Sequence, residues 1–207
     1  VPNGVQPQPV DADPASRERW EQFAETTSES GFTLGAVMRL DENKRPFLWL
    51  NVAAAVHARR PDARFIVVGD GRLRAHAEEH AARLGIGART LFVGRSTYVG
   101  YWLARMDTLM LLSRQEGLPN ALIEAQLAGV PVVTTPAGGA SETTLDGETG
   151  LILPDADHVQ PNMVADLIIA NFFDSSRRQA MSARAVRWAN ERFSLRSMLE
   201  GTLALYH

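Results

Sequence analysis

Short apolar runs alternate with longer segments of helical periodicity along most of the chain. Runs that are apolar throughout are typical of strands buried on both faces. We expect strands at Phe32–Val37, Arg64–Val68, Thr90–Val93, Thr108–Leu112, Val130–Thr134 and Gly150–Leu153. The segments between them predict helices near residues 47–59, 72–84, 97–105, 119–128 and 140–145, with two or three further helices in 162–206.

This alternation predicts an α/β fold, a doubly wound Rossmann-like parallel sheet, because parallel strands need right-handed crossovers that place helices on both faces. We expect six strands in the order 3-2-1-4-5-6. Residues 1–30 are polar and contain proline, with one short helix around Ser16–Thr26, so we interpret them as an interdomain linker and 31–207 as the domain proper. Ligands of such sheets bind beyond the carboxyl ends of the strands, so site residues are expected in the loops that follow them.

Charge and composition narrow the class of partner. The 207 residues carry a net charge of −3 and include no cysteine. A nucleic-acid-binding protein normally shows a basic stripe or a high pI, so we expect no nucleic-acid partner. Without cysteine there is no disulfide or thiol chemistry, and no run of about 18 apolar residues predicts a transmembrane segment. Any anion site must therefore be local.

The loop after the first expected strand is rich in cations. Arg39, Lys44 and Arg45 lie within seven residues, just before a helix that Pro46 can open. Two cations that converge on one point could neutralise a diphosphate, the group that leaves when a sugar nucleotide reacts. A solvated charged turn is the alternative, and these residues alone leave both open.

The loop after the fourth expected strand holds two glutamates with different placements. Gly117 and the proline that follows place Glu116 in the loop, whereas Glu124 lies in the second turn of the next helix. The N–H groups of Asn120–Leu122 at the start of that helix form an anion site. Glu116, the start of the helix and Glu124 could together bind the sugar, diphosphate and ribose of one ligand. A surface glutamate and an ordinary helical glutamate are the alternative.

The remaining motifs give weaker indications of a binding or metal site. The sequence from Gly69 to Gly71 lacks the third glycine of a dinucleotide fingerprint and indicates a plain turn. His76 and His80 match a zinc pattern, but no third ligand follows. The pair Gly138-Gly139 permits either close approach to a ligand or tight packing, and both stay open. The two Asp-Ala-Asp sequences lie in Pro-flanked loops and are interpreted as turns, so we expect no metal site.

In combination, these motifs resemble retaining glycosyltransferase family 4. The spacing from Glu116 to Glu124 matches the E-x7-E signature of that family. Val1–Val5 resembles the segment that joins the two domains of the family. Further matches occur at Leu111–Ser113, Ala128–Val133, Gly138-Gly139, Asp146–Leu151 and Arg192–Ser194. The similarity runs along nearly the whole chain.

The resemblance implies a GT-B enzyme, in which two Rossmann-like domains flank a cleft. This chain is similar to the C-terminal, donor-binding domain, and the N-terminal acceptor domain is absent from it. Carried over by position, the catalytic residues are Arg39 and Lys44, which stabilise the leaving diphosphate, and Glu116, which contacts the donor sugar. The substrate-binding residues are Glu124 at the ribose, the backbone of Asn120, Ala121 and Leu122 at the phosphate, Gly117 in the same loop, and Gly94 and Arg95 beside the base.

The resemblance also implies a reaction. A sugar passes from a UDP- or GDP-linked donor to a glycan or lipid-linked acceptor with retention of configuration, in polysaccharide biosynthesis, and no metal or cofactor takes part. The implied location is the cytoplasm, either free or peripheral to the inner face of the membrane, and the fragment alone is expected to be inactive. Two departures leave the shape of the cationic loop open: Met38 and Arg45-Pro46 stand where glycines are usual.

Three other functions are possible for a chain of this fold. A sugar-nucleotide epimerase of the same fold fits the spacing from Glu116 to Glu124 less well. A phosphorylase would need a lysine for pyridoxal phosphate, and the only lysine, Lys44, is already assigned to the diphosphate. A nucleotide-binding module without catalysis remains open.

Overall fold

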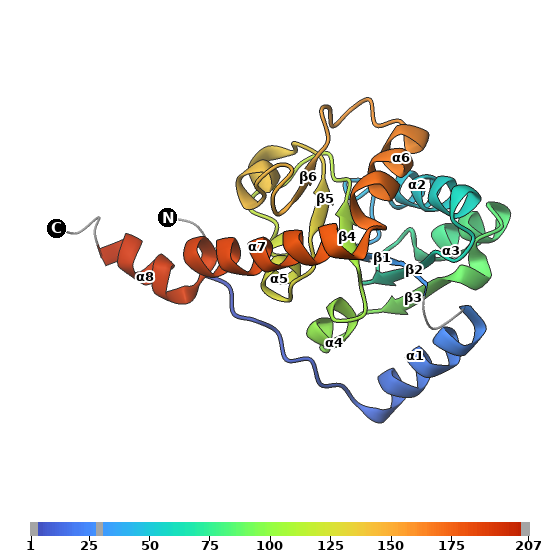
Figure 1. Ribbon diagram of the computed structural model, residues 1–207. Helices are drawn as coiled ribbons and strands as arrows, with labels where there is room; N and C mark the ends of the chain where they lie inside the picture. The colour runs from blue at the N-terminus through green and yellow to red at the C-terminus, as the bar shows by residue number, and fades with distance from the viewer. Residues whose placement is uncertain (1–3, 28–30, 204–207) are drawn as a thin grey trace.

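Six parallel strands form one sheet in the computed structural model, which describes residues 4–27 and 31–203 (Figure 1). The strands are β1 (Thr33–Val37), β2 (Arg64–Val68), β3 (Thr90–Gly94), β4 (Thr108–Leu111), β5 (Val132–Thr134) and β6 (Gly150–Ile152). They are ordered β3-β2-β1-β4-β5-β6. The predicted doubly wound fold and strand order are therefore confirmed.

Helices cover both faces of this sheet. The helices of the described residues are α1 (Pro14–Thr27), α2 (Pro46–Arg59), α3 (Arg74–Arg83), α4 (Val99–Leu103), α5 (Asn120–Leu127), α6 (Pro161–Phe172), α7 (Ser175–Phe193) and α8 (Leu195–Leu203), with 3-10 turns η1 (Gly87–Arg89) and η2 (Gly138–Thr143). Helix α2 packs against α3 and α6 in one layer, and α5 packs against α7 in the other (Figure 1). Right-handed crossovers from β1 outward in both directions produce these two layers.

The strands are apolar because both of their faces are buried. Leu34, Phe65 and Leu109, from three neighbouring strands, are fully buried. Trp49 of α2 packs edge-on against Phe65, and its Nε1 donates to Met110 O at 3.0 Å. The indole is thus satisfied inside the core, as a buried tryptophan requires.

Two departures from the sequence prediction have local causes, and the bounds of the other elements predicted by residue range differ by at most two residues. Strand β5 begins at Val132 rather than Val130, since Pro131 has no N–H to donate to the ladder. Residues 138–143 form the 3-10 turn η2 where an α-helix over 140–145 was expected. Gly138 opens that turn with φ +53, a conformation that other residues rarely adopt.

The predicted linker lies packed along the domain for much of its described length. Helix α1 buries Phe23, and Arg19 donates to Val93 O of β3 at 2.7 Å. Farther towards the amino terminus, a Cβ added to Gly100 of α4 would lie 2.3 Å from Pro9 O. The assignment of residues 1–30 as an interdomain linker stays a prediction.

Candidate functional site

The loops after β1 and β4 meet at the point where the strand order reverses. Strands β1 and β4 are neighbours, although they are first and fourth in the chain. Crevices at such switch points are where open α/β sheets bind ligands. The cationic loop and the loop that holds Glu116 are therefore side by side.

Two of the three predicted catalytic residues contact each other at this switch point. Lys44 Nζ forms an ion pair with Glu116 Oε1, and the two side chains are only 19% and 10% exposed. Partial removal from water strengthens an ion pair compared with one on the open surface. The structure thus holds an ammonium and a carboxylate together at the carboxyl edge of the sheet.

The third predicted catalytic residue, Arg39, forms its ion pair within its own loop rather than with Glu116. Its Nε pairs with Asp41 Oδ2 at 2.5 Å, and its side chain is 76% exposed. Burial by itself would raise the pKa of Asp41. The hydrogen bond from the Lys44 N–H and the nearby Arg39 guanidinium have a larger opposite effect, so the pKa of Asp41 lies below its ordinary value. Asp41 therefore stays ionised, and it accepts hydrogen bonds from the Arg39 guanidinium and from the backbone N–H of Lys44. Arg39 also borders a hollow of about 470 Å³ beside Gly71.

A residue that the sequence analysis did not single out, Asn43, joins the two loops. Its Nδ2 donates to Gln115 O at 2.9 Å, and its Oδ1 accepts from Gln115 N at 3.0 Å. The backbone adds a third bond, from Arg114 N to Asn43 O at 3.0 Å. Gln115 immediately precedes Glu116, so Asn43 fixes the position of Glu116 relative to Lys44. We name these three hydrogen bonds the Asn43 bridge.

Arg45 explains how the loop keeps its shape without the glycine that is usual after the lysine. It has φ +51 and is the only non-glycine residue with positive φ in the described part of the chain. Its guanidinium donates to three carbonyl oxygens, those of Leu112, Ser113 and Ala156. These charge-assisted bonds offset the backbone strain, which for a non-glycine residue is about 1–3 kcal/mol.

The glycine pair after β5 packs against the Glu116 loop. A Cβ added to Gly138 would lie 2.0 Å from Glu116 O, and one added to Gly139 would lie 2.0 Å from Gly117 O. Of the two interpretations left open by the sequence, these contacts favour tight packing. Gly117 itself has open space around it.

Helix α5 begins at Asn120, four residues after Glu116. Pro119 precedes the helix in an extended conformation and offers no side-chain cap, and the Leu122 N–H donates to Pro119 O at 3.1 Å. In the described ranges, the Ala121 N–H has no hydrogen-bond acceptor. Unpaired N–H groups in a first helical turn attract anions. Ala121 is thus the predicted phosphate contact that the geometry favours most.

Glu124, in the second turn of α5, is half-buried beside the amino-terminal segment. Its Oε1 accepts from Gln8 Nε2 at 3.3 Å. Burial raises the pKa of Glu124 above the ordinary 4.5, and the hydrogen bond from Gln8 offsets part of this effect. Gln8 lies 116 positions away in the sequence, so no local pattern pointed to it.

This pKa predicts a stability change for Glu124→Gln. Because the pKa of Glu124 is higher in the folded chain than in the unfolded chain, the protonated carboxyl group stabilises the fold. This contribution to the free energy of unfolding is present in full below pH 4.5 and is lost as the pH rises through the raised pKa. At pH 7 the buried charge is therefore destabilising, and Glu124→Gln should raise the melting midpoint by about 1–3 °C, which corresponds to under 1 kcal/mol. At pH 4 the melting midpoints of Glu124→Gln and the unaltered chain should coincide.

Glu79→Gln, on an exposed face of α3, is the control for this experiment. A lower melting midpoint for Glu124→Gln than for the unaltered chain at pH 7 would show that the buried charge of Glu124 is not destabilising.

The residues predicted beside the base lie on the other flank of the switch point. Gly94 ends β3 with φ +83, and its carbonyl accepts from Gly69 N at 2.8 Å. Arg95 follows it and is exposed. Their contact with a nucleotide base stays a prediction.

Of the remaining motifs, one histidine of the pair that matches a zinc pattern, His80, has a structural role. His80 Nε2 contacts Asn51 Oδ1 at 2.8 Å, and the ring packs edge-on against Phe47. Within residues 4–27 and 31–203, no group of three or more histidine or carboxylate side chains could hold a metal ion. In the same ranges no helix combines the length and the apolar character that a membrane span needs.

Comparison with known proteins gives the family. A family model described as glycosyl transferases group 1 matches residues 18–188. The Vi polysaccharide biosynthesis protein VipC/TviE of Salmonella typhi is 42% identical over 204 residues, which are 96% of this chain and 35% of that protein. The lipopolysaccharide core biosynthesis mannosyltransferase LpsB of Rhizobium meliloti is 30% identical over 180 residues, 84% of this chain and 50% of that protein. The chain thus spans a third to a half of the length of these relatives.

Solved structures share the fold. HepE (Alr3699) of Anabaena in complex with UDP superposes with a TM-score of 0.78 at 23% identity, over 93% of this chain and 53% of that one. The C-terminal domain of a glycosyl transferase group 1 family protein (LpcC) from Francisella tularensis superposes with a TM-score of 0.75 at 18% identity, over 93% of this chain and 100% of that one. With the family model matching residues 18–188, the chain belongs to the glycosyl transferases group 1 family.

Proposed function

We propose that this chain is the donor-binding domain of a retaining, family 4 glycosyltransferase, which transfers a sugar from a nucleotide sugar to an acceptor. The observation that carries the proposal is the ion pair between Lys44 and Glu116 at the switch point of the sheet. A cation for the leaving group and a carboxylate for the sugar are thereby held at one place. Membership in the glycosyl transferases group 1 family supports the reaction class.

The leaving diphosphate is the group that the site is proposed to stabilise. Breaking the bond between sugar and phosphate develops negative charge on the diphosphate. Fixed cations and helix N–H groups stabilise that charge where it forms. Lys44 and the Ala121 N–H supply both, and Arg39, being mostly exposed, is free to turn from Asp41 towards the phosphate. These groups take the place of a metal in the proposal.

The remaining contacts hold the rest of the donor. When the diphosphate engages Lys44, Glu116 is released to accept hydrogen bonds from sugar hydroxyls. Glu124 binds the ribose hydroxyls, and Gly94 and Arg95 flank the base. The sugar develops oxocarbenium character as the bond breaks, and retention follows from attack on the face that the diphosphate leaves.

The names of the relatives bear on the substrates. The Anabaena structure is a complex with UDP, and the Salmonella and Rhizobium proteins are named for the biosynthesis of polysaccharide and lipopolysaccharide core. We therefore propose a UDP- or GDP-linked donor and a glycan or lipid-linked acceptor that a part of the enzyme outside this chain binds. Under this proposal the domain alone binds donor but transfers little sugar.

Calorimetric titration of the chain with UDP, GDP and ADP tests the proposal and identifies the base. We expect saturable binding of UDP or GDP with a stoichiometry of one. If none of the three binds, the donor-binding role is wrong.

The Asn43 bridge gives a further prediction for nucleotide binding. Asn43→Ala removes two side-chain hydrogen bonds, each worth about 1 kcal/mol, so affinity for the nucleotide should fall about 5- to 30-fold. Asn43→Asp should weaken binding similarly, because a carboxylate cannot donate to Gln115 O. Asn190→Ala, which removes an exposed amide on α7, is the matched control. Unchanged affinity in Asn43→Ala would show that the bridge does not position Glu116.

A further inference from the structure

The segment that precedes α1 is anchored against α5 and α7 at its beginning. We name residues 4–13 the amino-terminal strap. Val5 is 8% exposed and belongs to a buried apolar cluster with Ile123 of α5 and Phe193 at the end of α7. Its backbone N–H donates to Phe193 O at 2.7 Å. The start of the strap is therefore held on the helix that carries Glu124.

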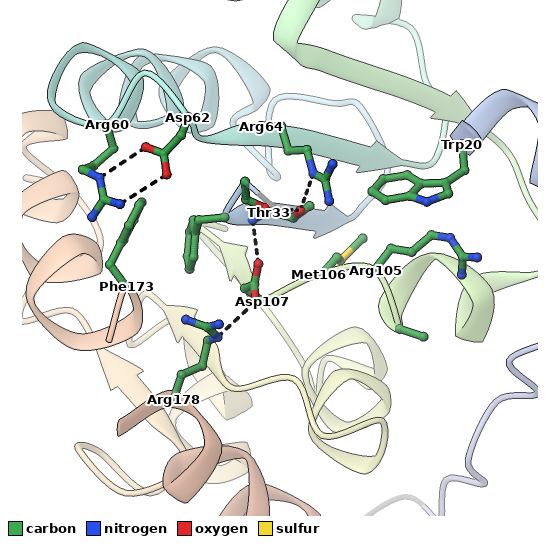
Figure 2. Close-up of a pocket in the computed structure, with 13 residues that line it drawn as sticks. Trp20, Thr33, Arg60, Asp62, Arg64, Arg105, Met106, Asp107, Phe173 and Arg178 are labelled. Atoms are coloured by element: carbon green, nitrogen blue, oxygen red, sulfur yellow. Dashed lines mark hydrogen bonds and ion pairs between the residues drawn. The ribbon is translucent and has the colours of Figure 1, made fainter. Parts of the chain in front are cut away.

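The strap is held at its other end as well. Ala12 is buried within the main core of the domain, and α1 follows directly. Figure 2 shows the Trp20 ring of α1 beside the guanidinium groups of Arg64 and Arg105, whose Cζ atoms lie 4.6 Å and 5.5 Å from the ring centroid. Cations over an indole ring are attracted to it electrostatically. The strap is consequently fixed to the domain on both sides of its middle.

The middle of the strap brings Gln8 to Glu124. The backbone there lies so close to α4 that a Cβ added to Gly100 would be 2.3 Å from Pro9 O and 2.7 Å from Gln8 O. The Gln8 side chain reaches α5, where its Nε2 donates to Glu124 Oε1 at 3.3 Å. In residues 4–27 and 31–203, no other group donates a hydrogen bond to the Glu124 carboxylate. The orientation of this carboxylate therefore depends on the strap.

Glu124 lies where the ribose of a bound nucleotide is expected. It follows Ala121, the favoured phosphate contact, by three positions, so it lies within one helical turn, about 5.4 Å, along α5. Its second oxygen, Oε2, has no hydrogen-bond donor within the described part of the chain. Burial raises the pKa of Glu124, while the bond from Gln8 acts against this rise. The amide thus favours the ionised form, which accepts hydrogen bonds, and leaves Oε2 available to hydroxyl groups.

We propose that Gln8 is a positioning residue of the donor site. Its amide holds the Glu124 carboxylate in the orientation that accepts hydrogen bonds from the ribose hydroxyls of the nucleotide. This role rests on the proposed donor-binding function and adds the strap to the site. Because the strap belongs to the segment interpreted as an interdomain linker, a displacement of the strap from α5 would lower nucleotide affinity without any change in the phosphate contacts.

Calorimetry on the 207-residue chain with UDP and 2′,3′-dideoxy-UDP tests this role, and the guanosine pair is used if GDP is the ligand. The unaltered chain should bind UDP more tightly, because only UDP offers ribose hydroxyls to Glu124. Gln8→Ala should weaken UDP binding about 3- to 10-fold, the effect of one hydrogen bond, and leave the affinity for dideoxy-UDP within about twofold. A loss confined to the ribose nucleotide separates the positioning of Glu124 from general damage to the site.

Three further variants define the contact. Gln8→Glu keeps the length of the side chain but has no N–H to donate, so at about pH 8 it should weaken UDP binding at least as much as Gln8→Ala. In the Glu124→Ala background, Gln8→Ala should change UDP affinity by less than about twofold, since its partner is absent. Gln6→Ala, which removes an exposed glutamine of the same strap, is the matched control and should bind both nucleotides normally. Melting curves confirm that each variant is folded.

The outcomes separate this role from the donor function itself. If no nucleotide binds to the unaltered chain, the donor-binding function is wrong, and the role of Gln8 is wrong with it. If the unaltered chain binds UDP and dideoxy-UDP equally, or if Gln8→Ala weakens both equally or neither, nucleotide binding stands and the positioning role of Gln8 is wrong.

Discussion

Replacing Lys44 with alanine is expected to weaken binding of UDP, or of GDP if that is the ligand, about 10- to 100-fold. The substitution removes the cation offered to the diphosphate and leaves Glu116, only 10% exposed, as an unpaired carboxylate beside the incoming anion. A hydrogen bond to a charged group contributes about 1.5–3 kcal/mol. Each 1.4 kcal/mol is a factor of about ten in affinity.

Two further variants separate the roles of the pair. Glu116→Gln combined with Lys44→Ala should recover part of the lost affinity, since the repelling carboxylate is gone. Arg83→Ala, which breaks an exposed ion pair with Glu79 on α3, should bind nucleotide normally. Calorimetry on these proteins and on Glu116→Gln alone measures the coupling between Lys44 and Glu116. Equal affinity in Lys44→Ala and the unaltered chain would remove Lys44 from the donor site.

Gly138→Ala is expected to destabilise the domain by about 2–4 kcal/mol, which lowers its melting midpoint by about 5–15 °C. Two effects combine at this position. The backbone has φ +53, which strains any residue with a Cβ, and the new methyl group would lie 2.0 Å from Glu116 O. The backbone must shift to relieve the contact, so the nucleotide affinity of the Glu116 loop should fall as well.

Two other glycines serve as matched controls for the melting experiment. Gly147 has φ +73 but open space around its added Cβ, so Gly147→Ala isolates backbone strain and should lower stability by about 1 kcal/mol. Gly117 has open space and no positive φ, so Gly117→Ala should melt close to the unaltered chain. If Gly138→Ala were no less stable than Gly147→Ala, the packing of the glycine pair against the Glu116 loop would be refuted.

Much of the fold could be predicted from the sequence because its signals are local. Runs such as residues 65–68 of β2 are fully buried, and their apolar character shows this directly. The boundary at Pro131 and the 3-10 turn at Gly138 were missed, although both depend on residues with known backbone constraints. The proline removes a ladder donor, and the glycine pair allows a tighter turn than helical periodicity suggests.

The site was predicted less completely because its supporting contacts join distant positions. Asn43 reaches residue 115, and Gln8 reaches Glu124, across 72 and 116 positions. Arg45 looked like one more cation of the loop, yet its guanidinium is bound to backbone carbonyls. The chemistry of Lys44 and Glu116 could be proposed from their residue types, whereas the positioning around them required the structure.

The crystal structure of the chain with bound UDP, or GDP if calorimetry selects it, tests the central claim most directly. The account predicts a diphosphate oxygen within about 3.2 Å of Lys44 Nζ and another at the same distance from the Ala121 N–H. Arg39 should have turned from Asp41 towards the phosphates. A diphosphate bound elsewhere, with the Lys44–Glu116 ion pair intact and the start of α5 unoccupied, would contradict it.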